Sequence, residues 1–247
     1  MAEMNSSTWQ QRLWRALRGE LFWGLVISIL ALWVFASLAD NIWEGESFAF
    51  DSQVIGLAHS VSSAGLTTFM MAVTMLGDWR VLAVLGVVFG VAWWQRGQRS
   101  KVVMLALAYL GGAALDQLLK LFFHRMRPET AGEVITVQGY SFPSGHAMMS
   151  LCFYGMLIYL LVHERSRLMR VLGLIAAVLL VGAIGLSRIY LGVHYPSDIL
   201  GGFTAGFAWL MANFLGYRDY RRRQGLDARA AENAGGGSAT NESTPQL

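Results

Sequence analysis

Charged residues are scarce in this chain, and cysteine is almost absent. Lysine, arginine, aspartate and glutamate make up 14% of the 247 residues, whereas a soluble globular domain carries roughly 25%. Hydrophobic residues make up 55% and are gathered in long runs. This composition excludes an ordinary soluble domain and indicates a multi-pass membrane protein. Cys152 stands alone, which excludes an intrachain disulfide and a cysteine-based metal site.

Six apolar segments are candidates for membrane-spanning helices, which need about 20 residues each. They cover residues 21–39, 81–94, 102–123, 147–162, 171–186 and 199–215. Residues 61–77 are also apolar but are interrupted by serine, threonine and glycine. We interpret them as a helix on the outer face or as an early part of the second span. The predicted fold class is therefore all-α, an integral membrane bundle of six transmembrane helices within residues 21–217.

The first apolar segment has a second interpretation as a cleaved signal peptide. Ser37-Leu38-Ala39 resembles the small-x-small pattern at which signal peptides are cut. The apolar run is longer than the usual core of a signal peptide. This length favours an uncleaved first span.

The basic residues predict how the bundle is oriented. Cytoplasmic loops carry an excess of lysine and arginine, and the net charge is only +3. We therefore interpret these residues as topology signals and not as a nucleic-acid-binding surface. If the N-terminus is cytoplasmic, the arginine-rich segments all lie inside: 1–20, 95–101, 163–170 and 217–223. The C-terminus is then cytoplasmic too, and residues 218–247 form a tail that is basic at first and disordered beyond Leu226.

Positive charge on the outer side of the membrane is an exception to this rule. Three segments assigned to that side, 120–128, 141–149 and 187–198, carry charged or titratable groups. Each has a structural explanation when taken alone: Lys120 can extend to the interface, and Arg188 can pair with Asp198. Among the groups that they bring to one face are two histidines, His146 and His194, three cations, Lys120, Arg127 and Arg188, and the carboxylate of Asp198. Ionisable groups beside spans are costly and usually serve function.

This set of side chains suits a reaction at phosphate. His146 and His194 can divide a nucleophilic and an acid–base role, because imidazole titrates near neutral pH. A nearby carboxylate can fix the tautomer of one imidazole by accepting its ring N–H. Lysine and arginine bind phosphate oxygens and stabilise the charge of a phosphoryl group in transfer.

The backbone of two of these segments contributes as well. Ser144 is a candidate N-cap of the following span, and free N–H groups at a helix N-terminus bind anions. Gly145 allows a close approach of the backbone. Asp198 is expected in the first turn of the sixth span, where negative charge is favoured. Its spacing from His194 brings the two side chains within hydrogen-bond reach.

The three segments together resemble the signature of the type 2 phosphatidic acid phosphatase superfamily, K-x6-R-P, P-S-G-H and S-R-x5-H-x3-D. Lys120 and Arg127-Pro128 fit the first part, and Pro143-Ser144-Gly145-His146 fits the second. Ser187-Arg188, His194 and Asp198 fit the third. The parts occur in the family's order within residues 120–198, and the layout of spans extends the resemblance to most of the chain.

The resemblance implies a metal-independent enzyme without a cofactor that hydrolyses a phosphate or diphosphate on a membrane lipid. His194 is implied as the nucleophile that forms a phosphohistidine, and Asp198 as its orienting partner. His146 is implied as the acid for the leaving oxygen and then the base for water. The implied phosphate-binding residues are Lys120, Arg127, Arg188, Ser144 and Gly145. The implied location is the cell (inner) membrane, with the site facing the periplasmic or extracellular side.

Undecaprenyl diphosphate and phosphatidylglycerol phosphate are the substrates we favour from the resemblance. A lipid A phosphatase and a lipid-to-lipid phosphotransferase are alternatives. A non-enzymatic lipid-binding protein is an alternative of another class, against which the complete signature argues. A zinc site made of the two histidines and Asp198 is disfavoured by the surrounding cations.

The motifs do not assign a role to three further polar residues near the first motif. Asp116 lies one helical turn before Lys120 and is a candidate ion-pair partner for it. His124 and Arg125 lie inside the x6 gap of the first motif. They either contact a lipid head group or line the interface.

Overall fold

The structure is a computed structural model that describes residues 20–45, 48–129, 134–135 and 137–236. Within these ranges the chain is helical and contains no strand, which confirms the all-α prediction. The helices are α2 (Glu20–Trp43), α3 (Ala49–Ser60), α4 (Ala64–Met75), α5 (Trp79–Gln95), α6 (Arg99–Phe123), α7 (Gly145–Val162), α8 (Arg167–Tyr190) and α9 (Pro196–Gly236). The chain divides into two compact units, residues 1–211 and 212–247.

Five helices in the described residues are long and apolar enough to cross a membrane. They are α2, α6, α7, α8 and the part of α9 up to Tyr220. The pair α4 and α5, bent by 46° at a short break, passes the same test when taken together. The number of candidate spans is therefore five, or six if the bent pair forms one span.

The outward faces of the bundle carry large apolar side chains that nothing in the described chain covers. Trp33 of α2, Val87 of α5, Leu118 of α6 and Leu179 of α8 are each more than half exposed. Contiguous apolar surface of this kind is unfavourable in water. It is the surface that lipid chains contact in a bilayer, where the backbone is satisfied inside each helix.

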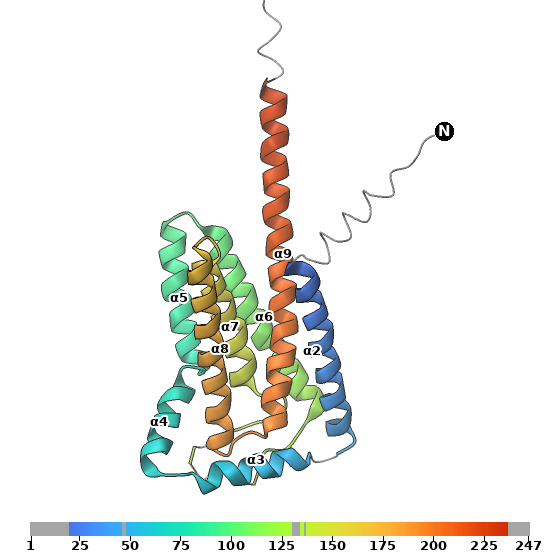
Figure 1. Ribbon diagram of the computed structural model, residues 1–247, viewed down its shortest axis with the longest axis vertical. Coiled ribbons are helices and arrows are strands. Elements are labelled where there is room, and N and C mark those ends of the chain that lie inside the picture. The colour runs from blue at the N-terminus through green and yellow to red at the C-terminus, as the bar shows by residue number, and fades with distance from the viewer. Residues whose placement is uncertain (1–19, 46–47, 130–133, 136, 237–247) are drawn as a thin grey trace, which may run out of the picture. The chain divides into compact units, whose positions relative to one another are not determined.

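Helix α7 lies at the centre of the first unit, packed between α6 and α8 (Figure 1). Two glycines let α9 approach it closely. A Cβ atom on Gly202 would lie 2.7 Å from the carbonyl oxygen of Ser144, and one on Gly206 would lie 3.1 Å from that of Met148. Small residues four apart are the usual means by which membrane helices bring their backbones together.

The break between α4 and α5 is stabilised by hydrogen bonds from neighbouring helices. The hydroxyl of Tyr154 in α7 donates to the carbonyl of Leu76 at 2.7 Å, and that of Tyr109 in α6 donates to the carbonyl of Trp79 at 2.8 Å. Asp78 caps α5 by accepting from the backbone N–H of Arg80 at 2.8 Å. A helix break at membrane depth is tolerated when its backbone groups find partners in this way.

The segment 61–77 was interpreted as a helix on the outer face or as an early part of the second span. Helix α4 occupies most of it and forms the first part of the bent pair with α5, as the second interpretation expects if the pair is one span. Helix α3 was not predicted, because residues 49–60 mix polar and apolar residues without a long apolar run. It lies across the end of the bundle at which α6 ends and α7 and α9 begin (Figure 1).

The C-terminal tail, residues 218–247, was predicted to be disordered beyond Leu226. The structure instead continues α9 to Gly236. Alanine, arginine and glutamate, which favour helices, are frequent in this stretch and account for the difference. Residues 237–247, and residues 1–19 of the predicted N-terminal tail, lie outside the described residues.

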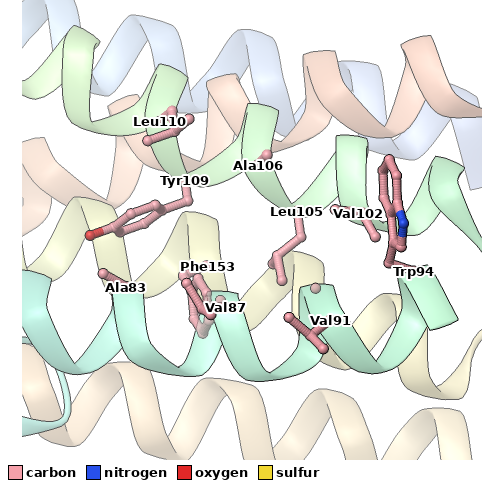
Figure 2. A pocket seen from close by; sticks show the side chains of 12 residues that line it. Ala83, Val87, Val91, Trp94, Val102, Leu105, Ala106, Tyr109, Leu110 and Phe153 are labelled. Carbon is pink, nitrogen blue, oxygen red and sulfur yellow. The ribbon is translucent and has the colours of Figure 1, made fainter.

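A cavity of about 500 Å³ lies between α5 and α6. Figure 2 shows Val87 and Val91 of α5 facing Leu105 and Tyr109 of α6, with Phe153 of α7 beside them. None of the residues that line it is charged. The cavity therefore suits a hydrocarbon chain and not a phosphate group.

Replacement of Gly202 by alanine should destabilise the bundle. The added methyl group would press on the backbone of α7, which cannot rotate away as a side chain can, and overpacking of this kind costs about 1–3 kcal/mol. The midpoint of thermal unfolding in detergent should fall by several degrees. Gly182→Ala is the matched control, because a Cβ atom on Gly182 in α8 meets nothing within 4 Å. Equal midpoints for the two variants would contradict this packing.

Candidate active site

His194 and Asp198 form the centre of a polar cluster at the end of the bundle crossed by α3. His194 lies in the turn between α8 and α9, and Asp198 lies in the first turn of α9. Both side chains are almost fully buried, and His194 Nδ1 lies 3.3 Å from Asp198 Oδ2. The predicted contact is present, although His194 precedes the helix and does not share its face with Asp198.

The partners of the His194 ring define its tautomer. A carboxylate only accepts hydrogen bonds, so Nδ1 must carry the proton that it donates to Asp198. On the other side, Nη1 of Arg127 lies 3.2 Å from Nε2. Arginine only donates, so Nε2 must be the unprotonated nitrogen. The imidazole therefore directs a lone pair toward Arg127.

Burial keeps the His194 ring neutral. Loss of water around the ring lowers the pKa of His194 from 6.5 to about 4, although the hydrogen bond and charge of Asp198 act in the opposite direction. The charges of Arg188 and Arg127 add to the lowering. At neutral pH the ring is thus uncharged, and Nε2 carries a lone pair, directed at Arg127, instead of a proton.

The Asp198 carboxylate is surrounded by donors. Its Oδ2 accepts from the backbone N–H of Tyr195 at 2.9 Å and from the hydroxyl of Ser141. Its Oδ1 accepts from Nη1 of Arg125 at 2.6 Å. A buried carboxylate with several donors is held in its ionised form. Arg188, considered above as its partner, does not form an ion pair with it in the described structure.

Arg127 is held in place by carbonyl oxygens. Its Nε donates to Gly139 at 3.0 Å, its Nη2 to Gln138 at 3.1 Å and its Nη1 to Val193 at 2.8 Å. Burial lowers the pKa of the guanidinium, and the charges of nearby carboxylates oppose this shift. Arginine remains charged in proteins. The structure thus fixes a positive charge next to Nε2 of His194.

Arg188 reaches the cluster from the last turn of α8. Its side chain is buried, and Nη1 donates to Oγ1 of Thr74 in α4 at 2.9 Å. Its Nε is buried and has no hydrogen-bond partner in the described part of the chain. An unsatisfied buried N–H of a cation requires an explanation, and a bound anion would supply the acceptor.

Lys120 lies against the N-terminus of α7. Its Nζ forms an ion pair with Asp116 Oδ2 at 2.7 Å, as expected from their spacing. A Cβ atom on Gly145 would lie 2.8 Å from this Nζ. Ser144 occupies the N-cap position, as predicted, but its buried hydroxyl caps nothing and has no partner in the described residues. The N-terminus of α7 therefore has three kinds of donor close to it: the Lys120 ammonium group, the Ser144 hydroxyl and the first backbone N–H groups of the helix.

His146 is the second residue of α7 and faces the same cluster. It lies within electrostatic range of His194, Arg188, Lys120 and Arg127. Its ring also lies against Gly77 in the break between α4 and α5, where a Cβ atom would be 3.1 Å from Cδ2. Because Gly77 has no side chain, the imidazole of His146 can lie against the backbone at this break.

All residues predicted for the site lie in this cluster, and the structure adds others that the sequence did not single out. Thr74, Gly77 and Asp51 lie in segments without a recognised motif, so no signal pointed to them. Ser141 stands shortly before the second motif, and Arg125 stands inside the first. For these two, the proximity to a motif was the available signal.

His124 has a structural role at the end of α6. Its backbone adopts a left-handed conformation with φ 50°, and it ends the helix. Its ring packs edge-on against Tyr140 with ring centroids 4.6 Å apart. It therefore turns the chain from α6 into the loop that carries Arg125 and Arg127.

The cluster provides a neutral imidazole with an unprotonated Nε2, a second imidazole and several fixed positive charges near a helix N-terminus. This arrangement suits nucleophilic attack on a phosphate group. Within the described residues, no group of three His, Cys, Asp or Glu side chains is placed to hold a metal ion.

Comparison with known proteins identifies the family. Residues 101–222 match the model of the PAP2 superfamily. The chain is 31% identical over 175 residues to phosphatidylglycerophosphatase B of Bacillus subtilis, a match that covers 70% of this chain and 85% of the relative. It is 25% identical over 202 residues to an undecaprenyl-diphosphatase of Sulfolobus acidocaldarius, covering 78% and 89%.

A solved structure extends the likeness to the fold. The crystal structure of a transmembrane PAP2-type phosphatidylglycerolphosphate phosphatase from Bacillus subtilis superposes with a TM-score of 0.71 at 28% identity. The superposition covers 78% of this chain and 96% of that one. The bundle and the polar cluster at its end thus occur in a chain that belongs to the PAP2 superfamily and is a membrane phosphatase.

Proposed function

We propose that this protein removes a phosphate group from a membrane lipid through a phosphohistidine on His194. The observation that carries the proposal is the orientation of the buried His194 ring. Its Nδ1 faces the Asp198 carboxylate, while Nε2 faces the positive charge of Arg127. A phosphate bound to Arg127 would therefore lie next to the unprotonated nitrogen of the ring.

In the first step, Nε2 of His194 attacks phosphorus and forms a P–N bond. The bond between phosphorus and the lipid oxygen breaks, and His146 donates a proton to that oxygen. The product is a lipid alcohol, or a lipid monophosphate if the substrate is a diphosphate. The ring of His194 becomes positively charged, and Asp198 stabilises this charge through Nδ1–H.

In the second step, water attacks phosphorus. His146, which gave up its proton in the first step, now accepts one from the water. The P–N bond breaks, inorganic phosphate leaves, and His194 returns to its neutral form. Protons and charge are restored in each cycle, and the chain's own residues supply every group required.

The phosphate oxygens are bound by the cations of the cluster. Arg127 and Arg188 supply guanidinium donors, and the Nε of Arg188 is a donor without another partner in the described structure. Further donors lie at the start of α7: the ammonium group of Lys120, the hydroxyl of Ser144 and the N–H of Gly145. Donors fixed before the reaction stabilise the charge that develops on the oxygens in the transition state.

The substrate is proposed to be phosphatidylglycerol phosphate or undecaprenyl diphosphate. The names of two relatives, phosphatidylglycerophosphatase B and undecaprenyl-diphosphatase, support this choice. The apolar outer faces of the bundle support a substrate whose chains stay in the bilayer. The polar cluster then meets the head group at the edge of the membrane.

We propose that the chain crosses the cell (inner) membrane six times. Both termini then lie in the cytoplasm. The bent pair of α4 and α5 counts as the second span. The active site then faces the periplasm or the cell exterior. The arginine-rich segments 95–101 and 163–170 support this orientation.

Loss of either histidine should abolish or severely reduce turnover. We expect purified protein in detergent to release phosphate from the two proposed lipids with excess EDTA present. His194→Ala should lower release to background, and His146→Ala should lower kcat by about 10²–10⁴-fold. A labelled substrate phosphate should be recovered on the wild-type protein after acid-free quenching. Undiminished release by folded His194→Ala protein would exclude the mechanism.

The His194 ring should stay neutral well below the pKa of a free histidine. Because burial lowers its pKa to about 4, protonation should begin only as the pH falls toward that value. NMR of protein with labelled histidine rings, assigned with His194→Gln, measures this directly. Its ring signals should be constant from pH 8 to about pH 5.5, since free histidine titrates at about 6.5. A midpoint near the free value would contradict the burial of an uncharged nucleophile.

Thiol labelling in intact cells should reveal the orientation. Ser62, between α3 and α4, and Gln98, between α5 and α6, are both exposed. A membrane-impermeant reagent should label Ser62→Cys but label Gln98→Cys only after the cells are opened. The natural Cys152 is buried and provides a low background. The opposite labelling pattern would reverse the proposed topology.

A further inference from the structure

Arg125 contacts the oxygen of the Asp198 carboxylate that His194 does not use. Asp198 uses Oδ2 for His194, for the backbone of Tyr195 and for Ser141, whereas Oδ1 accepts from Nη1 of Arg125 at 2.6 Å. The two oxygens therefore have separate partners. A rotation of the carboxylate that weakened the contact with His194 would also break the contact with Arg125.

The Arg125 guanidinium is itself fixed from several sides. Nη1 also donates to the hydroxyl of Ser197 at 2.7 Å, and Nη2 donates to Oδ2 of Asp51 at 3.1 Å. The guanidinium carbon lies 4.2 Å from the centre of the Tyr195 ring. Only 12% of the side chain is exposed. A planar fork with partners at both Nη atoms has one orientation, and a lysine could not reproduce it.

Asp51 anchors the other end of this contact. It belongs to the first turn of α3 and is 3% exposed. Its Oδ1 accepts from the backbone N–H of Ser197 at 2.8 Å, and its Oδ2 accepts from the hydroxyl of the same residue. Helix α3 is thus attached to the start of α9 through the same serine that contacts Arg125.

The charges make the arrangement interdependent. Arg125 is the cation that lies between two buried carboxylates, Asp51 and Asp198. Without it, each carboxylate would lose its ion pair, and the two would repel one another across Ser197. A buried charge that loses its partner is strongly destabilised. Asp198 would then be a weaker acceptor for the N–H of His194.

We propose that Arg125, held by Asp51 of α3, is a positioning residue that keeps Asp198 aligned on His194. This inference rests on the proposed function, because it assigns Arg125 a part in the same reaction. Arg125 acts through Asp198 and does not bind the phosphate, since its Nη atoms already donate to Asp198, Asp51 and Ser197. It differs in this from Arg127, which contacts Nε2.

The test measures kcat and KM for the full-length protein in detergent with a lipid phosphate substrate that the wild type hydrolyses. Arg125→Gln should lower kcat by about 10–100-fold, as loss of an orienting partner behind a reacting group does, and should change KM by less than about threefold. Arg125→Lys should recover part of kcat, because it keeps the charge but not the fork. Asp51→Asn should lower kcat less than Arg125→Gln. Arg80→Gln, at an exposed arginine of α5, should leave both constants unchanged.

A double-mutant cycle separates positioning from other roles. If Arg125 acts through Asp198, then adding Arg125→Gln to Asp198→Asn should cause little further loss of kcat. Independent, multiplying losses would overturn the proposal. An unchanged kcat in Arg125→Gln would overturn it as well, and so would a rise in KM at constant kcat, which would make Arg125 a substrate ligand.

Two further measurements keep the outcome clear. If Arg125→Gln alone does not fold, Asp51→Asn with Arg125→Gln removes one carboxylate together with the cation. That protein should fold and show the same low kcat, and full kcat in it would overturn the proposal. His194→Ala, measured in parallel, tests the proposed function separately. Activity in that variant would reject the phosphohistidine, whereas an inactive His194→Ala with a fully active Arg125→Gln would reject only the positioning role.

Discussion

The Asp198 carboxylate, ionised and shielded from water, is the group on which the arrangement of this end of the bundle depends. A carboxylate in such a place is stable only if donors replace the water that it has lost. The donors come from the turn before α9, from the loop that precedes α7 and from the loop that follows α6. Each contact also holds the segment that provides it. The interactions that stabilise one charge therefore bring the three signature segments together.

The polar end of the bundle is compatible with surrounding lipid chains because its polar groups form hydrogen bonds within the protein. The break between α4 and α5 would expose carbonyl groups at membrane depth, and the hydroxyls of Tyr154 and Tyr109 pair with them. The break in turn places Thr74 beside Arg188 and Gly77 beside His146. A discontinuity that would weaken a soluble helix thus lets the bent pair of α4 and α5 contribute to the candidate active site.

The sequence predicted the features that depend on composition and on short spacing. The all-helical fold follows from the length of the apolar runs, and the pairs His194–Asp198 and Lys120–Asp116 follow from separations of four residues. Contacts between distant segments could not be predicted in this way. Asp51 contacts Ser197 across a separation of 146 residues, and helix α3, which carries Asp51, has no long apolar run that would reveal it. The extent of α9 beyond Leu226 could not be predicted from apolar content, because the helix-favouring residues there are mostly polar or small.

The balance of charge in the cluster has a consequence for turnover. Lys120 and Arg125 are each neutralised by carboxylates, whereas Arg127 and Arg188 form no ion pair within the described residues. If these two cations bind the lipid phosphate, as proposed, they also attract free inorganic phosphate, which carries at least as much negative charge. Escape of that ion into water is therefore opposed by the same field that captures the substrate. Inorganic phosphate is therefore expected to inhibit turnover as a product, and oxyanions of similar shape compete for the same binding site.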